Sequence, residues 1–170
     1  KNADREQVRI FTKKRRERTL FYPELHGIKD LVTGDSAAFD GEMVVLEPDG
    51  KPSFQLSLVR ERVGNPDSLP YYTRKYPVIY IIFDILYYQG RLLTNLPLKE
   101  RQGVLFHCFQ PSSNMIIAEN YTEGLGLFDL MKKKGWEGIV SKKRDSLYLP
   151  AKNHGEWFKH KGLKKILAAV

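Results

Sequence analysis

The sequence predicts an α+β fold with two mostly antiparallel sheets and flanking helices. Segments with the period-two or β-rich character of strands are interleaved irregularly with segments of helical periodicity. No strand–helix–strand unit repeats, which disfavours a parallel sheet. With 170 residues, of which 42% are hydrophobic, the chain can build one domain with a core and is too short for two ordinary domains.

The first half of the chain contributes three strands and one helix. Residues 7–12 alternate polar and apolar side chains, as a half-buried strand does. A second strand over 37–46 ends at the turn Glu47-Pro48-Asp49-Gly50. Helical spacing follows over 54–62. Residues 77–88 are rich in Ile, Tyr, Val and Phe, which predicts a buried strand.

The second half of the chain adds two helices and three short strands. Pro97 suits the first turn of a helix, and the apolar stripe of that helix is Leu98, Leu105 and Phe109. Thr122 is expected to cap the next helix, which ends before Gly135. Its inward-facing residues are predicted to be Leu127, Leu130 and Met131. The strands are expected over 115–118, 136–142 and 156–161.

The composition narrows the class of partner. Lysine and arginine exceed the acids by eight, and such an excess favours phosphate-bearing ligands or nucleic acid over a solvated surface alone. No apolar run approaches the roughly 20 residues that span a bilayer. A single cysteine, Cys108, excludes an internal disulfide, so we expect a cytoplasmic protein. The basic clusters lie at residues 13–18, 132–134, 142–144 and 159–165.

Four short sequence motifs, called strings below, place polar groups within strands whose other residues are typical of a buried core. In Asp40-Gly41-Glu42, alternation puts both carboxylates on one face, and Gly41 permits the close approach of a ligand or another backbone. Such a pair suits a hard cation or a sugar hydroxyl. The alternative is an acidic pair that faces solvent on an edge strand.

The remaining three strings lie further along the chain. Glu137-Gly138 again sets a carboxylate before a glycine at the head of a strand. Lys159 and Lys161 share a strand face with Trp157, about 7 Å apart, which matches a phosphate whose charge must be stabilised. A solvated lysine face is the alternative. Phe83 could stack on a nucleobase or simply belong to the core.

Taken in order, these strings resemble the motif series of the covalent nucleotidyltransferases, the superfamily of ATP-dependent DNA ligases, RNA ligases and mRNA capping enzymes. They are most similar to the ligase module of bacterial end-joining enzymes. The match runs along nearly the whole chain. The matching strings are Tyr22-Pro23-Glu24-Leu25, Asp40-Gly41-Glu42, Phe83-Asp84-Ile85-Leu86, Gly90-Arg91-Leu92-Leu93, Pro97-Leu98-Lys99-Glu100-Arg101, Glu137-Gly138 and Trp157-Phe158-Lys159-His160-Lys161.

The resemblance implies an ATP-grasp-like adenylation fold and a role for each string. Glu42 would bind the ribose of AMP or help to place a metal, and Glu137 would help to hold Mg²⁺ or Mn²⁺. Phe83 would stack on the adenine of ATP. Lys159 and Lys161 would contact the α-phosphate and, with Glu137, act in catalysis. Lys142 would join them only through a bulge, because alternation otherwise puts it opposite Glu137.

The sequence departs from the family pattern at the nucleophile. The resemblance implies a lysine in Lys-x-Asp-Gly-x-Arg, roughly a dozen residues before the strand that is expected at 7–12. Lys1 has neither the spacing nor the glycine. We therefore expect residues 1–161 to be an adenylation domain truncated at its N-terminus and unable to adenylate itself. Residues 162–170 would begin a hinge to an oligonucleotide-binding domain.

The resemblance also implies a substrate and a partner protein, and two alternative functions stay open. The substrate would be nicked or broken double-stranded DNA, sealed during DNA repair and recombination. A Ku-like end-binding protein would be a partner at the bacterial nucleoid. The nearest alternative is an RNA ligase or an mRNA capping enzyme. A different class is a non-catalytic nucleic-acid-binding relic.

Overall fold

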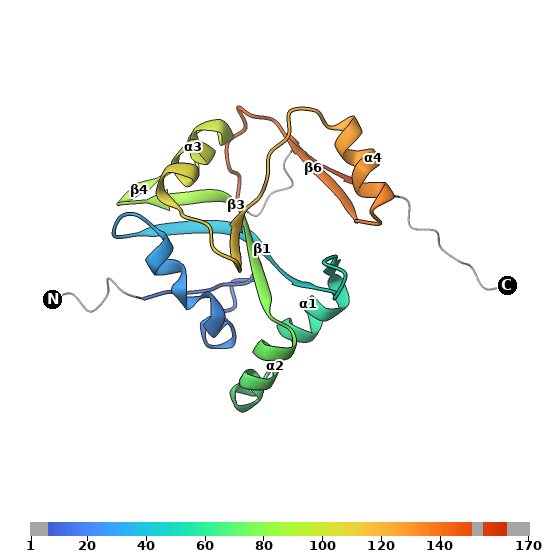
Figure 1. Ribbon diagram of the computed structural model, residues 1–170. Helices are drawn as coiled ribbons and strands as arrows, with labels where there is room; N and C mark the ends of the chain where they lie inside the picture. The colour runs from blue at the N-terminus through green and yellow to red at the C-terminus, as the bar shows by residue number, and fades with distance from the viewer. Residues whose placement is uncertain (1–6, 151–154, 163–170) are drawn as a thin grey trace.

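Two long antiparallel strands form the centre of the larger sheet (Figure 1). The computed structural model describes residues 7–150 and 155–162. Strand β1 (Ala37–Leu46) pairs with β3 (Val78–Tyr88) over almost its whole length. Short strands extend the sheet on both sides, and one of them, β5 (Met115–Ile117), runs parallel to β3. The other two are β2 (Pro52–Ser53), beside β1, and β4 (Arg91–Leu92), beside β3.

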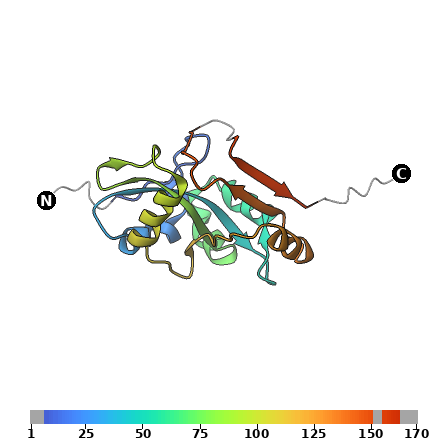
Figure 2. The ribbon, with the colours of Figure 1, turned by 90° about the horizontal axis from the view of Figure 1, so that it is seen from above.

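A separate hairpin makes the second sheet. Strands β6 (Gly138–Lys142) and β7 (Trp157–Lys161) pair antiparallel in unbroken register. Figure 2 shows the two strands side by side, with helix α4 (Leu125–Lys133) next to β6. The α+β class with mostly antiparallel sheets is therefore confirmed.

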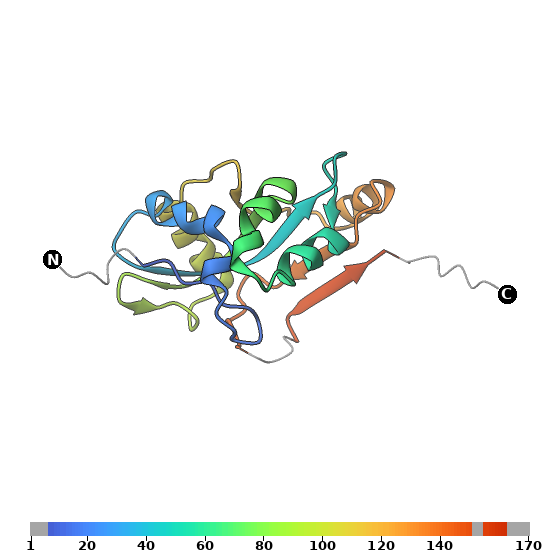
Figure 3. The same ribbon diagram turned by 90° about the horizontal axis from the view of Figure 1, so that it is seen from below.

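The remaining helices surround the larger sheet. Helix α3 (Leu98–Cys108) lies at the top of Figure 1, whereas α1 (Phe54–Glu61) and α2 (Leu69–Lys75) lie on the lower side and face the viewer in Figure 3. None of the helices in residues 7–150 and 155–162 has the length and apolarity to cross a membrane. The short 3₁₀ helices are η2 (Thr19–Phe21), η3 (Pro23–Leu31) and η4 (Pro66–Ser68).

The core lies between the larger sheet, α3 and η3. Ile82 and Ile85 on β3 are both fully buried in it, although strict alternation would direct them to opposite faces. A register shift between Asp40 and Gly41 of β1 falls at this point and re-aims the strand. The predicted α3 stripe is confirmed, because all three of its residues are buried. These residues are Leu98, Leu105 and Phe109.

Three local predictions are wrong. Residues 7–12 form no strand; only an isolated bridge joins Phe11 to Glu17, since a turn at residues 12–16, in which Arg15 has a φ of +60°, reverses the chain before a ladder can extend. Thr122 does not cap α4. The Glu123 carboxylate instead accepts hydrogen bonds from the backbone N–H groups of Leu125 and Gly126 at 2.8 Å. Leu130 is 45% exposed rather than inward-facing.

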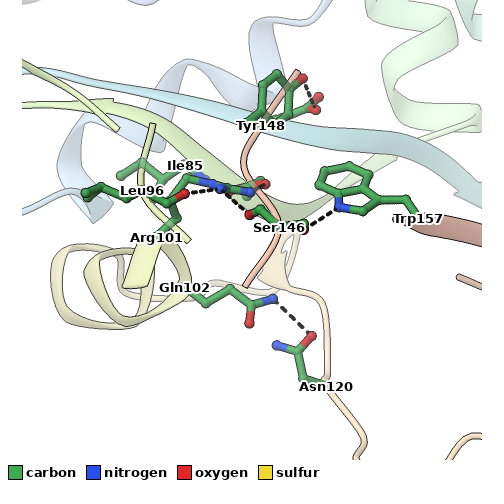
Figure 4. Close-up of polar contacts among 10 residues, drawn as sticks. Ile85, Leu96, Arg101, Gln102, Asn120, Ser146, Tyr148 and Trp157 are labelled. Atoms are coloured by element: carbon green, nitrogen blue, oxygen red, sulfur yellow. Dashed lines mark hydrogen bonds and ion pairs between the residues drawn. The ribbon is translucent and has the colours of Figure 1, made fainter. Parts of the chain in front are cut away.

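A buried ion pair ties α3 to the centre of the sheet. Arg101 and Asp84 are both fully buried. The Nε and Nη2 atoms of Arg101 donate to the two carboxylate oxygens at 2.8 Å each. Its Nη1 atom donates to the carbonyls of Leu96, at 2.6 Å, and Ser146, at 3.2 Å (Figure 4). The bidentate geometry and the extra carbonyl partners offset the cost of burying two charges.

Replacing Arg101 by Met should destabilise the protein by about 3–5 kcal/mol, because the Asp84 carboxylate would stay buried without its counter-charge. Urea unfolding measures the loss. Lys99→Met is the matched control. Lys99 lies on the same helix as Arg101, but it pairs with Asp145 of the segment after β6 and both side chains are about half exposed. Such pairs contribute about 1 kcal/mol or less. Equal losses in the two variants would contradict this account.

Candidate functional site

The β6–β7 hairpin gathers three of the predicted lysines on one face. Residues paired across antiparallel strands point to the same side. Lys142 is paired with Trp157, and Lys159 and Lys161 alternate with them along β7. Helix α4 covers the opposite face, where the Phe128 ring lies 6.5 Å from that of His160. The lysine face is therefore the one that α4 leaves uncovered.

Lys161 and Glu137 meet at one end of this face. Lys161 Nζ lies 2.7 Å from Glu137 Oε1, and both side chains are about two-thirds exposed. The backbone is tight here. A Cβ atom at Gly138, where φ is +148°, would lie 1.9 Å from the carbonyl oxygen of His160. Only glycine fits, and its conformation interrupts the alternation between Glu137 and the strand.

Lys142 lies at the other end of the face, against the larger sheet. Its Nζ atom is 4.2 Å from the ring centroid of Phe83 on β3 and 4.1 Å from that of Trp157 on β7. The ammonium therefore makes cation–π contacts with both sheets at once. No bulge is needed to bring it there, since the β6–β7 register is regular from Gly138 to Lys142. The expectation of a bulge is wrong.

The surroundings of Lys142 lower the pKa of its ammonium group. Burial lowers the pKa of Lys142, and the charge of Arg101 lowers it further. The carboxylates of Asp84 and Asp40 oppose part of this effect. The net direction is downward, so Lys142 is less strongly held in the charged form than a surface lysine.

The Asp40-Gly41-Glu42 string serves packing as well as chemistry. A Cβ atom at Gly41 would lie 2.5 Å from both the Ile81 carbonyl oxygen and the Tyr80 ring, so the predicted close approach is made by the neighbouring strand. The Asp40 carboxylate accepts a hydrogen bond from the Tyr148 hydroxyl at 2.7 Å. The residue left unpaired at the register shift after Asp40 is Phe83 of β3 and not a residue of β1, so the register leaves the alternation of Asp40 and Glu42 along β1 uninterrupted.

The structure thus joins some predicted residues and not others. Glu137 contacts Lys161, and Lys142 contacts Phe83. Glu42 is exposed on β1 opposite Ile81. Within residues 7–150 and 155–162, neither Glu42 nor Lys159 forms an ion pair with these groups. In the same part of the chain, no cluster of three His, Cys, Asp or Glu side chains could hold a metal.

Two hollows on the surface lie elsewhere. One, of about 460 Å³, is lined by residues of η3 and α2, including Pro23 and Thr73. The other, of about 430 Å³, lies between the N-terminal segment and η3, beside Glu17 and His26. Neither of these two hollows is lined by a predicted site residue.

Sequence reasoning missed three residues that hold the site together. Arg101, Ser146 and Tyr148 link α3, the segment after β6, and β1. Arg101 had a signal, because a lone arginine at helical spacing from Leu98 and Leu105 falls on the buried face. Ser146 and Tyr148 lie in a segment without periodicity, and their roles depend on contacts with distant residues.

Comparison with known proteins gives consistent results. Residues 1–161 match the family described as ATP dependent DNA ligase domain. Over 155 residues the chain is 34% identical to an SPbeta prophage-derived DNA ligase-like protein LigB of Bacillus subtilis, covering 90% of this chain and 53% of that protein. It is 31% identical over 159 residues to a multifunctional non-homologous end joining DNA repair protein LigD of Mycobacterium tuberculosis, covering 94% of this chain and 19% of that protein.

The fold comparison agrees. The ligase domain of LigD from M. tuberculosis superposes with a TM-score of 0.71 and 28% sequence identity, covering 92% of this chain and 48% of that one. A structure of mycobacterial DNA ligase D complexed with ATP and MES gives the same values. The chain therefore spans about half the length of the Bacillus relative and a smaller share of the end-joining proteins.

Gly138→Ala should unfold the β6–β7 hairpin or displace β7, because the added methyl group would overlap the His160 carbonyl. We expect a loss of at least about 3 kcal/mol. Gly135→Ala is the control: Gly135 also has a positive φ, of +72°, but has open space around it, so only about 1 kcal/mol should be lost. Thermal unfolding compares the two, and a milder effect at position 138 than at 135 would contradict the assignment.

Proposed function

This chain belongs to the family of ATP-dependent DNA ligase domains, and we propose from that premise that it carries the nucleotide- and phosphate-binding part of the adenylation domain. The reaction proceeds in three transfers. A lysine would attack the α-phosphate of ATP and release pyrophosphate. The AMP would then pass from the lysine to a 5′-phosphate at a nick or break, and a 3′-hydroxyl would join that phosphate and release AMP. Each transfer places negative charge on non-bridging phosphate oxygens, which fixed cations stabilise.

The observation that supports this proposal best is the uncovered face of the β6–β7 hairpin. Three ammonium groups share that face, and one of them, Lys142, already touches Phe83 on the other sheet. A nucleotide between the two sheets would meet an aromatic ring for its base on one side and cations for its phosphate on the other. We propose that Phe83 stacks on adenine and that Lys159 and Lys161 contact the α-phosphate, with Lys142 beside them.

Glu137 and Glu42 are the proposed contacts for the divalent ion and the ribose. Mg²⁺ is commonly held by only one or two carboxylates together with substrate phosphates and water, so the two proposed carboxylates are enough for this ion. Glu137 would hold it beside the phosphate-binding lysines, and Glu42 would face the ribose or the ion. When bound, Mg²⁺ or Mn²⁺ supplies positive charge against the phosphate oxygens.

The proposed substrate is nicked or broken double-stranded DNA. The net charge of +8 favours association with a polyanion. The mycobacterial relatives are named for non-homologous end joining, and a Ku-like end-binding protein is the corresponding proposed partner. Repair of broken ends in a bacterial nucleoid is the setting in which these features would act together.

Lys159→Ala should slow self-adenylation of the full-length protein by about 100-fold, because one cation facing the transferred phosphate is lost. Transfer of radiolabelled AMP from ATP to the protein measures the rate. Lys143→Ala is the control, since Lys143 forms an exposed ion pair with Glu156 next to the same hairpin and is not one of the lysines proposed to contact the phosphate. Equal rates in wild type and Lys159→Ala would refute the site.

The 170-residue chain should not acquire AMP covalently, since it contains no Lys-x-Asp-Gly string. The same chain joined to an upstream segment that carries such a string should be labelled under the same conditions. Lys1 falls outside the described residues, so mass spectrometry of any labelled peptide is the informative readout. A phosphoramidate on a lysine of the isolated piece would overturn this expectation and identify the nucleophile directly.

A further inference from the structure

The segment that follows β6 runs across the start of helix α3. We call residues 143–149 the strap. Its backbone carbonyls accept hydrogen bonds from the first N–H groups of α3: Leu98 donates to Ser146 and Lys99 to Arg144, each at 2.9 Å. Tyr148 in turn donates its backbone N–H to Thr94 at 3.0 Å. These bonds satisfy helix donors that would otherwise lack partners, and they fix the path of the strap.

Side chains then connect the strap to both sheets. The Ser146 hydroxyl accepts a hydrogen bond from Trp157 Nε1 on β7 at 2.8 Å, and the Ser146 carbonyl accepts from Arg101 (Figure 4). Tyr148 donates to Asp40 on β1 and packs its ring edge-on against Trp157, with centroids 5.9 Å apart. Ser146 is therefore the point at which α3 and β7 are joined.

We propose that Ser146 and Arg101 are positioning residues that act through Trp157. Arg101 holds the Ser146 backbone, Ser146 holds the Trp157 indole, and the indole forms one side of the slot that contains the Lys142 ammonium. This chain of contacts sets where the lysine face of the hairpin lies relative to Phe83. The inference rests on the proposed function, because its consequence is the placement of the cations that face the α-phosphate.

The physical reason is geometric. Stabilisation of a developing charge depends steeply on where the fixed cations lie, and a misplacement of about 1 Å can cost 100-fold in rate. Trp157 is only half-buried, and its ring packs edge-on against Tyr148. The hydrogen bond to Ser146 adds a directional restraint at the indole nitrogen, in the manner of second groups that orient residues in direct contact with a ligand.

Ser146→Ala in the full-length protein tests this directly. It removes the hydroxyl acceptor and leaves the carbonyl that α3 uses. We expect kcat for self-adenylation to fall roughly five- to tenfold while KM for ATP changes by less than about twofold, because placement in the transition state is lost rather than binding. Ser141→Ala is the control, since Ser141 loses a hydrogen bond of the same length to His160 on the opposite face, and it should react as wild type.

A double-mutant cycle separates positioning from stability. If Ser146 acts through the indole, Ser146→Ala should add no further loss in a Trp157→Phe background. A multiplicative loss would overturn the proposal, as would a fall in kcat that merely follows a lowered Tm. A wild-type protein that never acquires AMP would overturn the proposed function as well. An active wild type with identical Ser146→Ala and Ser141→Ala variants would overturn the positioning role alone.

Discussion

The buried pair of Asp84 and Arg101 is the constraint on which the arrangement of the two sheets depends. A fully buried guanidinium is tolerated only when its donors are satisfied. Here the Asp84 carboxylate accepts from two of its nitrogens and backbone carbonyls accept from the third. Those acceptors come from β3, from the turn before α3 and from the strap. One side chain therefore fixes the mutual position of three segments that are distant in sequence.

The site shows a second kind of electrostatic organisation. The pair between Lys161 and Glu137 is exposed, and exposed pairs contribute little to stability. Under the proposed function, Lys161 would therefore exchange a carboxylate for a phosphate oxygen at small cost. The buried Arg101 has no such freedom, because losing Asp84 would leave an uncompensated charge in the interior. The buried Arg101–Asp84 pair thus keeps its partners, whereas the exposed Lys161–Glu137 pair at the surface of the site is free to change partners.

The sequence predicted the parts of the fold that are governed by periodicity. Strands β1 and β3 and helix α3 follow from patterns of ten or more residues, and the α3 stripe is buried as expected. The two lysines of β7 share a face because alternation is local to one strand. By contrast, Ile82 and Ile85 reach the same core only through a register shift that involves β1, and no local pattern on β3 specifies it.

The same distinction limits what could be predicted about the site. Phe83 and Lys142 come from different sheets, and their contact depends on how the strap is held. Ser146 and Tyr148 are surface-type residues in a segment without periodicity, and only the packing of α3 and β7 gives them their roles. Helix α2 was missed for a related reason, since its seven residues are too few to show a stripe.

The crowding at Gly41 has a consequence for how relatives of this chain can diverge. Of the three nearest atoms that a methyl group would meet there, one belongs to the Ile81 backbone and two to the Tyr80 ring. A smaller residue at position 80 would relieve only part of the conflict. No compensating substitution elsewhere can remove a main-chain oxygen, so glycine is required at position 41 whatever residue stands at position 80.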